Sequence, residues 1–315
     1  MTEPLPLTIL SRDAQLLRSL LEARQLPGLR IDQCETAPAA ISCSEVRLLL
    51  ADPNLAAQIV PDCQHLRWCQ STWAGNTPLL SLSKRDYQLT GVKGIFGTQM
   101  REYVLAYLLY FSRNIATFNR QQRDTPPHWE EAPISRLAGQ TLGILGAGSI
   151  ASEVAPAARA LGMKVIGMSR RGGEAHAFDA IYTPDQQHQF AGQCNALLNL
   201  LPDTPQTENL IDKALLSSLP DGAILINAGR GSAIVDDDLL DALNNGTLRA
   251  AVLDVFRQEP LPPTHPFWHH EAIYITSHTA AISRPEDVIE VFAANAKRFI
   301  NDEPLHYVFD FERGY

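Results

Sequence analysis

The sequence predicts an α/β protein with two lobes, each built around a parallel sheet. Short apolar runs alternate with stretches of helical periodicity along most of the 315 residues, which is typical of parallel sheets covered by helices. A glycine-rich turn, Gly146-Ala147-Gly148, joins one apolar run to a helical stretch. Arg230, Glu259 and His278 lie at or just beyond the ends of three later runs. Because parallel sheets bind ligands beyond the carboxyl ends of their strands, these residues are expected to meet beside a nucleotide.

Composition and charge narrow the class of protein. The chain is 45% hydrophobic and 19% charged, as in ordinary globular proteins. A net charge of −9, without any Lys/Arg cluster longer than a pair, argues against a nucleic-acid partner. The five cysteines lack CxxC spacing, and neither a signal peptide nor an apolar run of membrane-spanning length is evident. We therefore expect a cytoplasmic enzyme with reduced thiols, without a membrane partner.

The first hundred residues predict a small parallel α/β lobe. Leucines at 16, 17, 20 and 21 recur with helical period, so a helix is expected over 13–25. Strands are expected at 7–10, 46–52, 66–71 and 87–92.

A long helix over 100–114 separates the first lobe from the second. It is apolar almost all round, so we expect it to be buried or to lie at a subunit contact. The polar, proline-containing stretch after it is expected to be a connection or an extended arm, and together these features suggest a homodimer. Strands are then expected at 141–145, 163–168, 179–182, 195–200, 223–228, 249–255 and 272–277, and helices at 149–161, 185–191, 212–218, 236–245 and 285–300.

The last helix is the natural return to the first lobe. We therefore expect a discontinuous substrate domain, 1–98 plus 285–315, and a dinucleotide-binding domain, 99–284, with a cleft between them.

The glycine turn reads G-x-G-x-x-A and lies within a strand–turn–helix–strand sequence. Gly146 permits a tight turn, Gly148 permits close approach of a pyrophosphate, and Ala151 permits close helix–strand packing. The amides of Ser149 and Ile150, which begin the following helix, are expected to face the phosphates. The pattern predicts a Rossmann dinucleotide site, although a glycine turn can also join any strand to a helix.

The end of the next strand indicates which dinucleotide is bound. Many NAD sites have an acidic residue there, whereas this chain has Met168-Ser169-Arg170-Arg171. Ser169 can hydrogen-bond a 2′-phosphate and Arg170 or Arg171 can pair with it. NADP(H) is therefore predicted as the preferred cofactor, with NAD(H) as the alternative; a solvated pair of surface arginines is the competing interpretation.

Several motifs together resemble the D-isomer-specific 2-hydroxyacid dehydrogenases, particularly their glyoxylate/hydroxypyruvate reductase branch. The resemblance runs from about Leu66 to the C-terminus and is densest from 141 to 281. It implies a Rossmann domain and a flavodoxin-like substrate domain. The motifs are GILGAGSIA, LLNLLPDTPQTENLI, ILINAGRGSAIVDDDLLDAL, AAVLDVFRQEPLP, HPFW, ITSHTAA and the closing FERGY.

The resemblance assigns catalytic roles to Arg230, Glu259 and His278, and their chemistry supports those roles. A guanidinium can hold a substrate carboxylate with two hydrogen bonds. An imidazole titrates near neutral pH, so His278 suits a general acid, and Glu259 beside it would orient the ring and favour imidazolium. Alternatively, Arg230 merely ends a strand and Glu259 is a loop carboxylate.

The remaining site predictions concern the cofactor and the substrate carboxylate. Asp254 resembles the family residue that binds the nicotinamide carboxamide, although a strand-end cap explains it equally well. The loop Trp73-Ala74-Gly75 resembles the one whose amides bind the substrate carboxylate. No metal site is predicted, because histidines and cysteines lack ligand spacing. Further expected cofactor contacts are Leu200, Leu201, Pro202, Ala228 and, less directly, Met100, which also suits a core position.

The sequence thus predicts NADPH-dependent reduction of small 2-oxo acids, such as glyoxylate and hydroxypyruvate, to 2-hydroxy acids (glycolate, D-glycerate). One alternative is a broad-specificity dehydrogenase for larger 2-ketoacids. Another is a non-catalytic dinucleotide-sensing protein on the same scaffold, since fold alone does not determine function.

Overall fold

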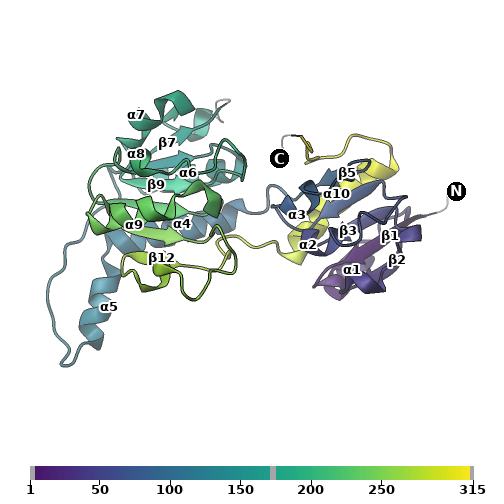
Figure 1. The fold of residues 1–315 in the computed structure, drawn as a ribbon, viewed down its shortest axis with the longest axis horizontal. Coiled ribbons are helices and arrows are strands. Elements are labelled where there is room, and N and C mark those ends of the chain that lie inside the picture. Colours follow the sequence, from purple (N-terminus) through teal and green to yellow (C-terminus); the bar gives the residue numbers. More distant parts are fainter. Residues whose placement is uncertain (1–3, 171–174, 313–315) are drawn as a thin grey trace. The chain divides into compact units, whose positions relative to one another are not determined.

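The computed structural model describes residues 4–170 and 175–312. The chain forms two compact units, Met1–Ile95 with Ser283–Tyr315, and Phe96–Ile282 (Figure 1). Each unit is built around one parallel sheet, which confirms the predicted fold class.

The first unit contains a five-stranded sheet in the order β2-β1-β3-β4-β5. All four strand pairs are parallel. The direction of strand progression reverses between β1 and β3, where open α/β sheets open a crevice at the carboxyl ends. Its elements are β1 (Leu5–Leu10), α1 (Ala14–Arg24), β2 (Leu29–Glu35), β3 (Leu48–Ala51), α2 (Pro53–Ala56), β4 (Trp68–Ser71), α3 (Thr77–Leu80), β5 (Gln88–Thr90) and α10 (Pro285–Ile300), with 3₁₀ turns at Pro38–Ala40 and Cys43–Glu45.

Aromatic packing joins the C-terminal helix α10 to this first sheet. Trp68 of β4 is fully buried and stacks on Phe292 at 5.2 Å and on Phe299 at 5.3 Å between ring centroids. Its indole nitrogen donates a hydrogen bond to Thr90 Oγ1 at 2.7 Å, so this buried polar group is satisfied.

Strand β2 was not predicted from the sequence. Its residues alternate between half-buried and exposed positions along most of its length, and it forms the edge of the sheet. Polar residues such as Arg30 and Asp32 therefore interrupt the apolar run that identifies a buried strand.

The second unit contains a seven-stranded sheet in the order β12-β11-β10-β9-β6-β7-β8. Every pair is parallel, and strand progression reverses between β6 and β9. Its elements are α4 (Gly97–Ser112), α5 (Ile115–Arg123), β6 (Thr141–Leu145), α6 (Ser149–Ala160), β7 (Lys164–Met168), β8 (Ala180–Tyr182), α7 (Gln187–Ala191), β9 (Ala196–Asn199), α8 (Lys213–Leu216), β10 (Ala223–Asn227), α9 (Asp236–Asn244), β11 (Leu248–Leu253) and β12 (Ile273–Ile275), with 3₁₀ turns at Ala175–Ala177, Pro184–Gln186, Gly231–Ala233 and Pro266–His269.

Two apolar cores cover opposite faces of this second sheet. One contains Val104 of α4 and Val154 of α6, and the other contains Leu215 of α8 and Leu239 of α9. Burying both faces explains why strands such as β6 and β9 consist almost entirely of apolar residues.

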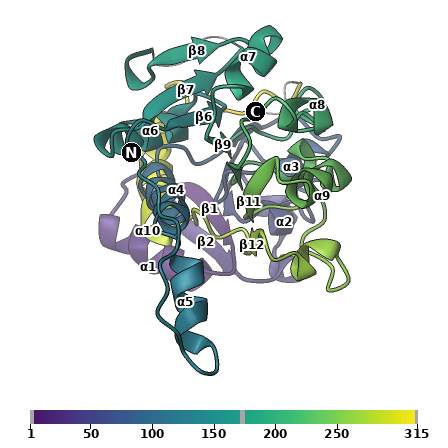
Figure 2. The ribbon, with the colours of Figure 1, turned by 90° about the vertical axis from the view of Figure 1, so that its left-hand side faces the viewer.

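Helix α5 corrects the expectation that an irregular arm directly follows the long helix. Asn114 adopts a left-handed conformation (φ 52°) that ends α4 and allows α5 to begin at Ile115. Helix α5 and the loop after it project from the second unit (Figure 2). The polar sequence NRQQR concealed this helix, because little of it is buried.

Among the described residues, the structure contains no helix that is both long and apolar enough to cross a membrane.

Candidate active site

Three turns at the carboxyl ends of neighbouring strands carry the predicted catalytic residues. Arg230 follows β10, Glu259 follows β11, and His278 follows β12. The last two turns are joined directly, because the His278 amide donates a hydrogen bond to the Asp254 carbonyl at 2.8 Å. The parallel sheet therefore brings together residues far apart in the sequence.

Glu259 and His278 form a hydrogen-bonded pair, with Oε2 and Nδ1 separated by 2.8 Å. The other carboxylate oxygen, Oε1, accepts the Phe256 amide at 2.9 Å, which fixes the carboxylate. About half of the His278 side chain is exposed (51%), against 36% for Glu259. With Nδ1 directed at the carboxylate, the ring presents Nε2 for proton exchange with a ligand.

The charges around this pair favour imidazolium. The hydrogen bond that His278 donates to Glu259 raises the pKa of His278, and the Glu259 charge adds to this effect, while burial and the Arg230 charge oppose it. Burial raises the pKa of Glu259, but the His278 and Phe256 hydrogen bonds and the charges of His278 and Arg230 outweigh it and lower that pKa overall. The pair is therefore built to hold a proton on the ring.

Buried asparagines shape the turn that carries Arg230. Asn199 at the end of β9 donates to Asn227 Oδ1 at 2.9 Å, and Asn227 donates to the Arg230 carbonyl at 3.1 Å. The Arg230 guanidinium donates to the Gly229 carbonyl at 2.7 Å. Burial lowers the pKa of Arg230, while the charges of Asp203 and Glu259 raise it. Arginine stays charged, so the turn presents a fixed cation.

The Arg230 turn packs against the loop that carries Glu259. A Cβ atom at Gly231 would lie 1.9 Å from the Phe256 carbonyl carbon, so only glycine fits this contact. Arg257 strengthens it by donating to Asn209 Oδ1 and to the carbonyls of Ser232 and Ile234. The turn that carries Arg230 and the loop that carries Glu259 are therefore held together by direct packing.

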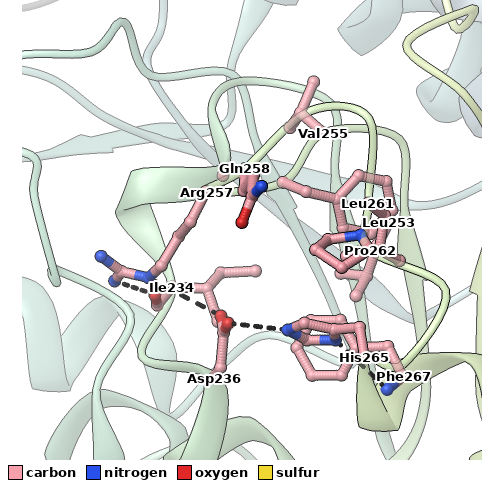
Figure 3. Close-up of a pocket in the computed structure, with 12 residues that line it drawn as sticks. Ile234, Asp236, Leu253, Val255, Arg257, Gln258, Leu261, Pro262, His265 and Phe267 are labelled. Carbon is pink, nitrogen blue, oxygen red and sulfur yellow. Dashed lines mark hydrogen bonds and ion pairs between the residues drawn. The ribbon is translucent and has the colours of Figure 1, made fainter.

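A pocket of about 200 Å³ lies behind the Glu259 loop. Figure 3 shows Asp236 between Arg257 and His265, with nitrogen–oxygen distances of 3.7 and 3.4 Å. Burial raises the pKa of Asp236, and the charges of Arg257 and His265 oppose that effect. Neither Glu259 nor His278 lines this pocket. We therefore infer that the ion pairs of Asp236 stabilise the loop that carries Glu259.

The glycine turn has both the space and the hydrogen-bond donors that a dinucleotide needs. Gly146 has φ 95°, and a Cβ there would approach the Leu200 carbonyl oxygen at 3.2 Å. A Cβ at Gly148 would meet no atom within 4 Å, which leaves room above the start of α6. Helix α6 has no acidic residue in its first turn, and no described group accepts from the amides of Ser149 and Ile150. Such amides are suited to phosphate binding.

The other predicted cofactor residues surround the same sheet edge. Leu200, Leu201 and Pro202 follow β9, and the Ala228 amide donates to the Asn199 carbonyl at 3.1 Å. Ser169 and Arg170 follow β7, whereas Arg171 lies outside the described residues. Met100 is only 4% exposed and packs in the core beside α6, so its contact with the cofactor remains a prediction.

The predicted carboxylate loop belongs to the first unit and follows β4. There, Asp52 is buried and accepts hydrogen bonds from Ser11 Oγ at 3.0 Å, the Arg12 amide at 2.9 Å and Thr72 Oγ1 at 2.5 Å. Trp73 lies beside Arg12, whose guanidinium carbon is 5.4 Å from the indole centroid. The carboxyl edge of the first sheet therefore carries the backbone amides of the Trp73-Ala74-Gly75 loop and the Arg12 guanidinium.

Several supporting residues were missed by reasoning from sequence, among them Asn199, Arg257, Asp52 and Tyr103. One signal was available for the first: ALLN and AILIN both end apolar runs in asparagine, and the two asparagines pair across the sheet. Within the described ranges no group of three metal-ligating side chains occurs, so no metal is assigned.

Comparison with known proteins gives a consistent result over nearly the whole chain. Residues 105–280 match the family model described as D-isomer specific 2-hydroxyacid dehydrogenase, NAD binding domain. A crystal structure of a D-isomer specific 2-hydroxyacid dehydrogenase family protein from Aeromonas salmonicida is 40% identical, with a TM-score of 0.91, and the match covers 98% of this chain and 100% of that one.

Two further solved structures are similar at lower identity. An NADPH-dependent glyoxylate/hydroxypyruvate reductase from Sinorhizobium meliloti, in complex with NADP and sulfate, is 28% identical with a TM-score of 0.86. A D-isomer specific 2-hydroxyacid dehydrogenase from Xanthobacter autotrophicus, in complex with NADPH and MES, is 26% identical with a TM-score of 0.86. Each match covers 98% of this chain and 99% of the other.

Proposed function

Because the chain belongs to the D-isomer specific 2-hydroxyacid dehydrogenase family, we propose that it reduces small 2-oxo acids with NADPH. Glyoxylate and hydroxypyruvate are the proposed substrates, and glycolate and D-glycerate the products. The observation that carries the proposal is the 2.8 Å pair of His278 and Glu259, electrostatically coupled to Arg230. A proton donor, its orienting carboxylate and a fixed cation are what reduction of a 2-oxo acid requires.

In this mechanism, Arg230 binds the substrate carboxylate through two hydrogen bonds and draws electron density from the neighbouring carbonyl. A nicotinamide dinucleotide held at the glycine turn would supply the hydride when bound. As negative charge develops on the carbonyl oxygen, His278 transfers its Nε2 proton to that oxygen and becomes neutral. Glu259 keeps the ring oriented and stabilises the imidazolium that is needed at the start.

The proposed cofactor site uses the glycine turn and the end of β7. Gly146 and Gly148 leave space for the pyrophosphate, and the amides of Ser149 and Ile150 bind it. Ser169, with Arg170 and Arg171, would bind a 2′-phosphate, and none of these three positions in the sequence is a carboxylate that would repel it. The Sinorhizobium and Xanthobacter proteins were crystallised with NADP and NADPH, which supports this preference.

We further propose that Ser283–Tyr315 and the first 95 residues form the substrate domain, whose Trp73-Ala74-Gly75 loop supplies amides to the carboxylate. The projecting arm after α5 supports a homodimer, because Trp129 on it is 98% exposed and tryptophan is enriched at protein–protein interfaces. Sedimentation of the purified protein tests this: a species of twice 34.7 kDa supports the dimer, and a monomer contradicts it.

Steady-state assays test the proposed function. Glyoxylate, hydroxypyruvate, pyruvate and phenylpyruvate would each be assayed with NADPH and NADH. We expect the highest kcat/KM for glyoxylate or hydroxypyruvate with NADPH. A preference for phenylpyruvate would instead support a broad 2-ketoacid enzyme, and negligible turnover of all four would contradict both and favour a dinucleotide-sensing protein.

A single substitution tests the proposed preference for NADPH over NADH. Arg170→Ala should raise KM for NADPH much more than KM for NADH, because only the former carries the 2′-phosphate. Arg159→Ala, on the neighbouring helix α6, is the matched control. Equal losses for both cofactors would contradict the assignment of Arg170.

A further inference from the structure

We propose that Tyr103 of helix α4 is a positioning residue for His278, and that it acts through Thr276 and Asp254. The inference rests on the proposed function, since it concerns how the proposed proton donor is held. It adds Tyr103, which lies outside the motifs that carry the proposed catalytic residues.

The segment after β12 needs external support because of its backbone conformation. His278 has φ 57°, in the left-handed region that residues other than glycine seldom adopt. Such a conformation persists only where surrounding contacts determine it. In addition, 51% of the His278 side chain is exposed, so packing of the ring contributes little to this constraint.

Asp254 supplies most of that constraint from the end of β11. Its carbonyl accepts the His278 amide at 2.8 Å, its Oδ1 accepts the Thr279 amide at 2.8 Å, and its Oδ2 accepts the Ala280 amide at 3.0 Å. Asp254 is only 2% exposed, so its carboxylate depends on protein donors in place of water. Three consecutive amides therefore converge on one buried residue.

Two hydroxyl groups connect this carboxylate to helix α4. Thr276 Oγ1 donates to Asp254 Oδ1 at 2.5 Å, and Tyr103 Oη lies 2.8 Å from Thr276 Oγ1. A threonine hydroxyl can donate one hydrogen bond, and Thr276 donates it to the carboxylate. Tyr103 must therefore be the donor to Thr276. Burial raises the pKa of Tyr103, which keeps that donor protonated. The chain therefore runs from Tyr103 through Thr276 to Asp254.

The position of this chain separates its effect from substrate binding. Arg230, the proposed carboxylate ligand, lies on the turn after β10 and forms no hydrogen bond or ion pair with Thr276 or Tyr103 among the described residues. Loss of the Tyr103 hydroxyl frees Thr276 to rotate and loosens the segment from 276 to 280. Proton transfer depends steeply on geometry, so kcat should fall while KM for the 2-oxo acid changes little.

The pH profile gives a second readout. The charged groups that act on His278 are Glu259, Arg230 and Asp254. Of these, the Glu259 hydrogen bond contributes most to the raised pKa of His278, and it requires the ring to stay in place. A loosened turn weakens that bond, so the pKa of His278 should fall. The alkaline limb of kcat should then move to lower pH.

The test compares Tyr103→Phe and Thr276→Val with two reference variants. Tyr110→Phe removes a hydroxyl from the same helix, where the ring packs on Tyr274 at 5.5 Å between centroids instead of reaching Thr276. Thr276→Ser restores the hydroxyl. We expect Tyr103→Phe and Thr276→Val to lower kcat roughly tenfold and to shift the alkaline limb to lower pH, while Tyr110→Phe and Thr276→Ser behave like the original protein.

A histidine NMR titration distinguishes this inference from the proposed function. The His278 signal is assigned by its loss in His278→Gln, and its pKa should fall in Tyr103→Phe but not in Tyr110→Phe. An unchanged pKa together with unchanged kcat would overturn the inference. If the original protein reduced no 2-oxo acid, the proposed function would fail, and the NMR titration alone would still decide whether Tyr103 positions His278.

Discussion

Both sheets hold a buried aspartate at their carboxyl edge, but the two aspartates organise different chemistry. In the first unit, Asp52 accepts hydrogen bonds from Ser11, Arg12 and Thr72. In the second, Asp254 accepts them from Thr276, Thr279 and Ala280. In both turns a buried carboxylate accepts hydrogen bonds from a threonine hydroxyl and from at least one backbone amide, and so fixes the turn.

The difference lies in what each turn carries. The Asp254 turn carries His278, which is paired with Glu259 and can move a proton. Near Asp52, the described residues include Arg12 beside Trp73 and a glycine-containing loop, but no pair of hydrogen-bonded acid and base. We infer that loosening the Asp254 turn should lower kcat and that loosening the Asp52 turn should raise KM for the 2-oxo acid.

The largest effect should come from His278→Ala, which removes the proton donor. We expect kcat to fall by about 10²–10⁴. His188→Ala on helix α7 removes an exposed imidazole that hydrogen-bonds Ser218, and should leave turnover unchanged. Steady-state kinetics with hydroxypyruvate measure both, and an active His278→Ala protein would contradict the assignment.

Arg230→Lys should come next, because a lysine keeps the charge but loses the paired hydrogen bonds. We expect kcat/KM to fall about 10–100-fold, as for loss of a charged hydrogen bond. Arg18→Lys serves as the control, because Arg18 is exposed on α1 and pairs across the helix surface with Glu22. Equal kcat/KM for the Arg230 variant would show that the guanidinium geometry is unimportant.

Glu259→Gln should have a smaller effect that depends on pH. Glu259 raises the pKa of His278, so reduction is fastest below that pKa and slows as pH rises through it. Without the carboxylate charge this pKa falls, and the alkaline limb of kcat should move to lower pH. Activity at low pH should be largely retained. An unmoved limb would contradict the role of Glu259.

Asp52→Asn should have the smallest effect on turnover and the clearest effect on KM. The amide removes an acceptor from buried donors, which costs about 1–3 kcal/mol of stability and loosens the Trp73 turn. We expect KM for the 2-oxo acid to rise severalfold with kcat little changed. A fall in kcat alone would break the proposed division between the two edges.

Features that depend on short stretches of sequence were predicted, whereas features that depend on contacts between distant residues were largely missed. Apolar runs identified most buried strands, and the residues that follow them placed Arg230, Glu259 and His278 at one edge. The supports were harder to predict. The asparagines that end ALLN and AILIN were a signal for the Asn199–Asn227 pair, whereas Tyr103 and Thr276 carry no such signal, because they meet only when helix α4 packs beside β12. Helix α5 was missed because its composition is polar.

A crystal structure with NADPH and oxamate, an unreactive analogue of a 2-oxo acid, tests the central claim most directly. We predict that the oxamate carboxylate contacts the Arg230 guanidinium and that its carbonyl oxygen lies about 3 Å from His278 Nε2. Oxamate bound away from Arg230, or an imidazole whose Nε2 does not face it, would contradict the account.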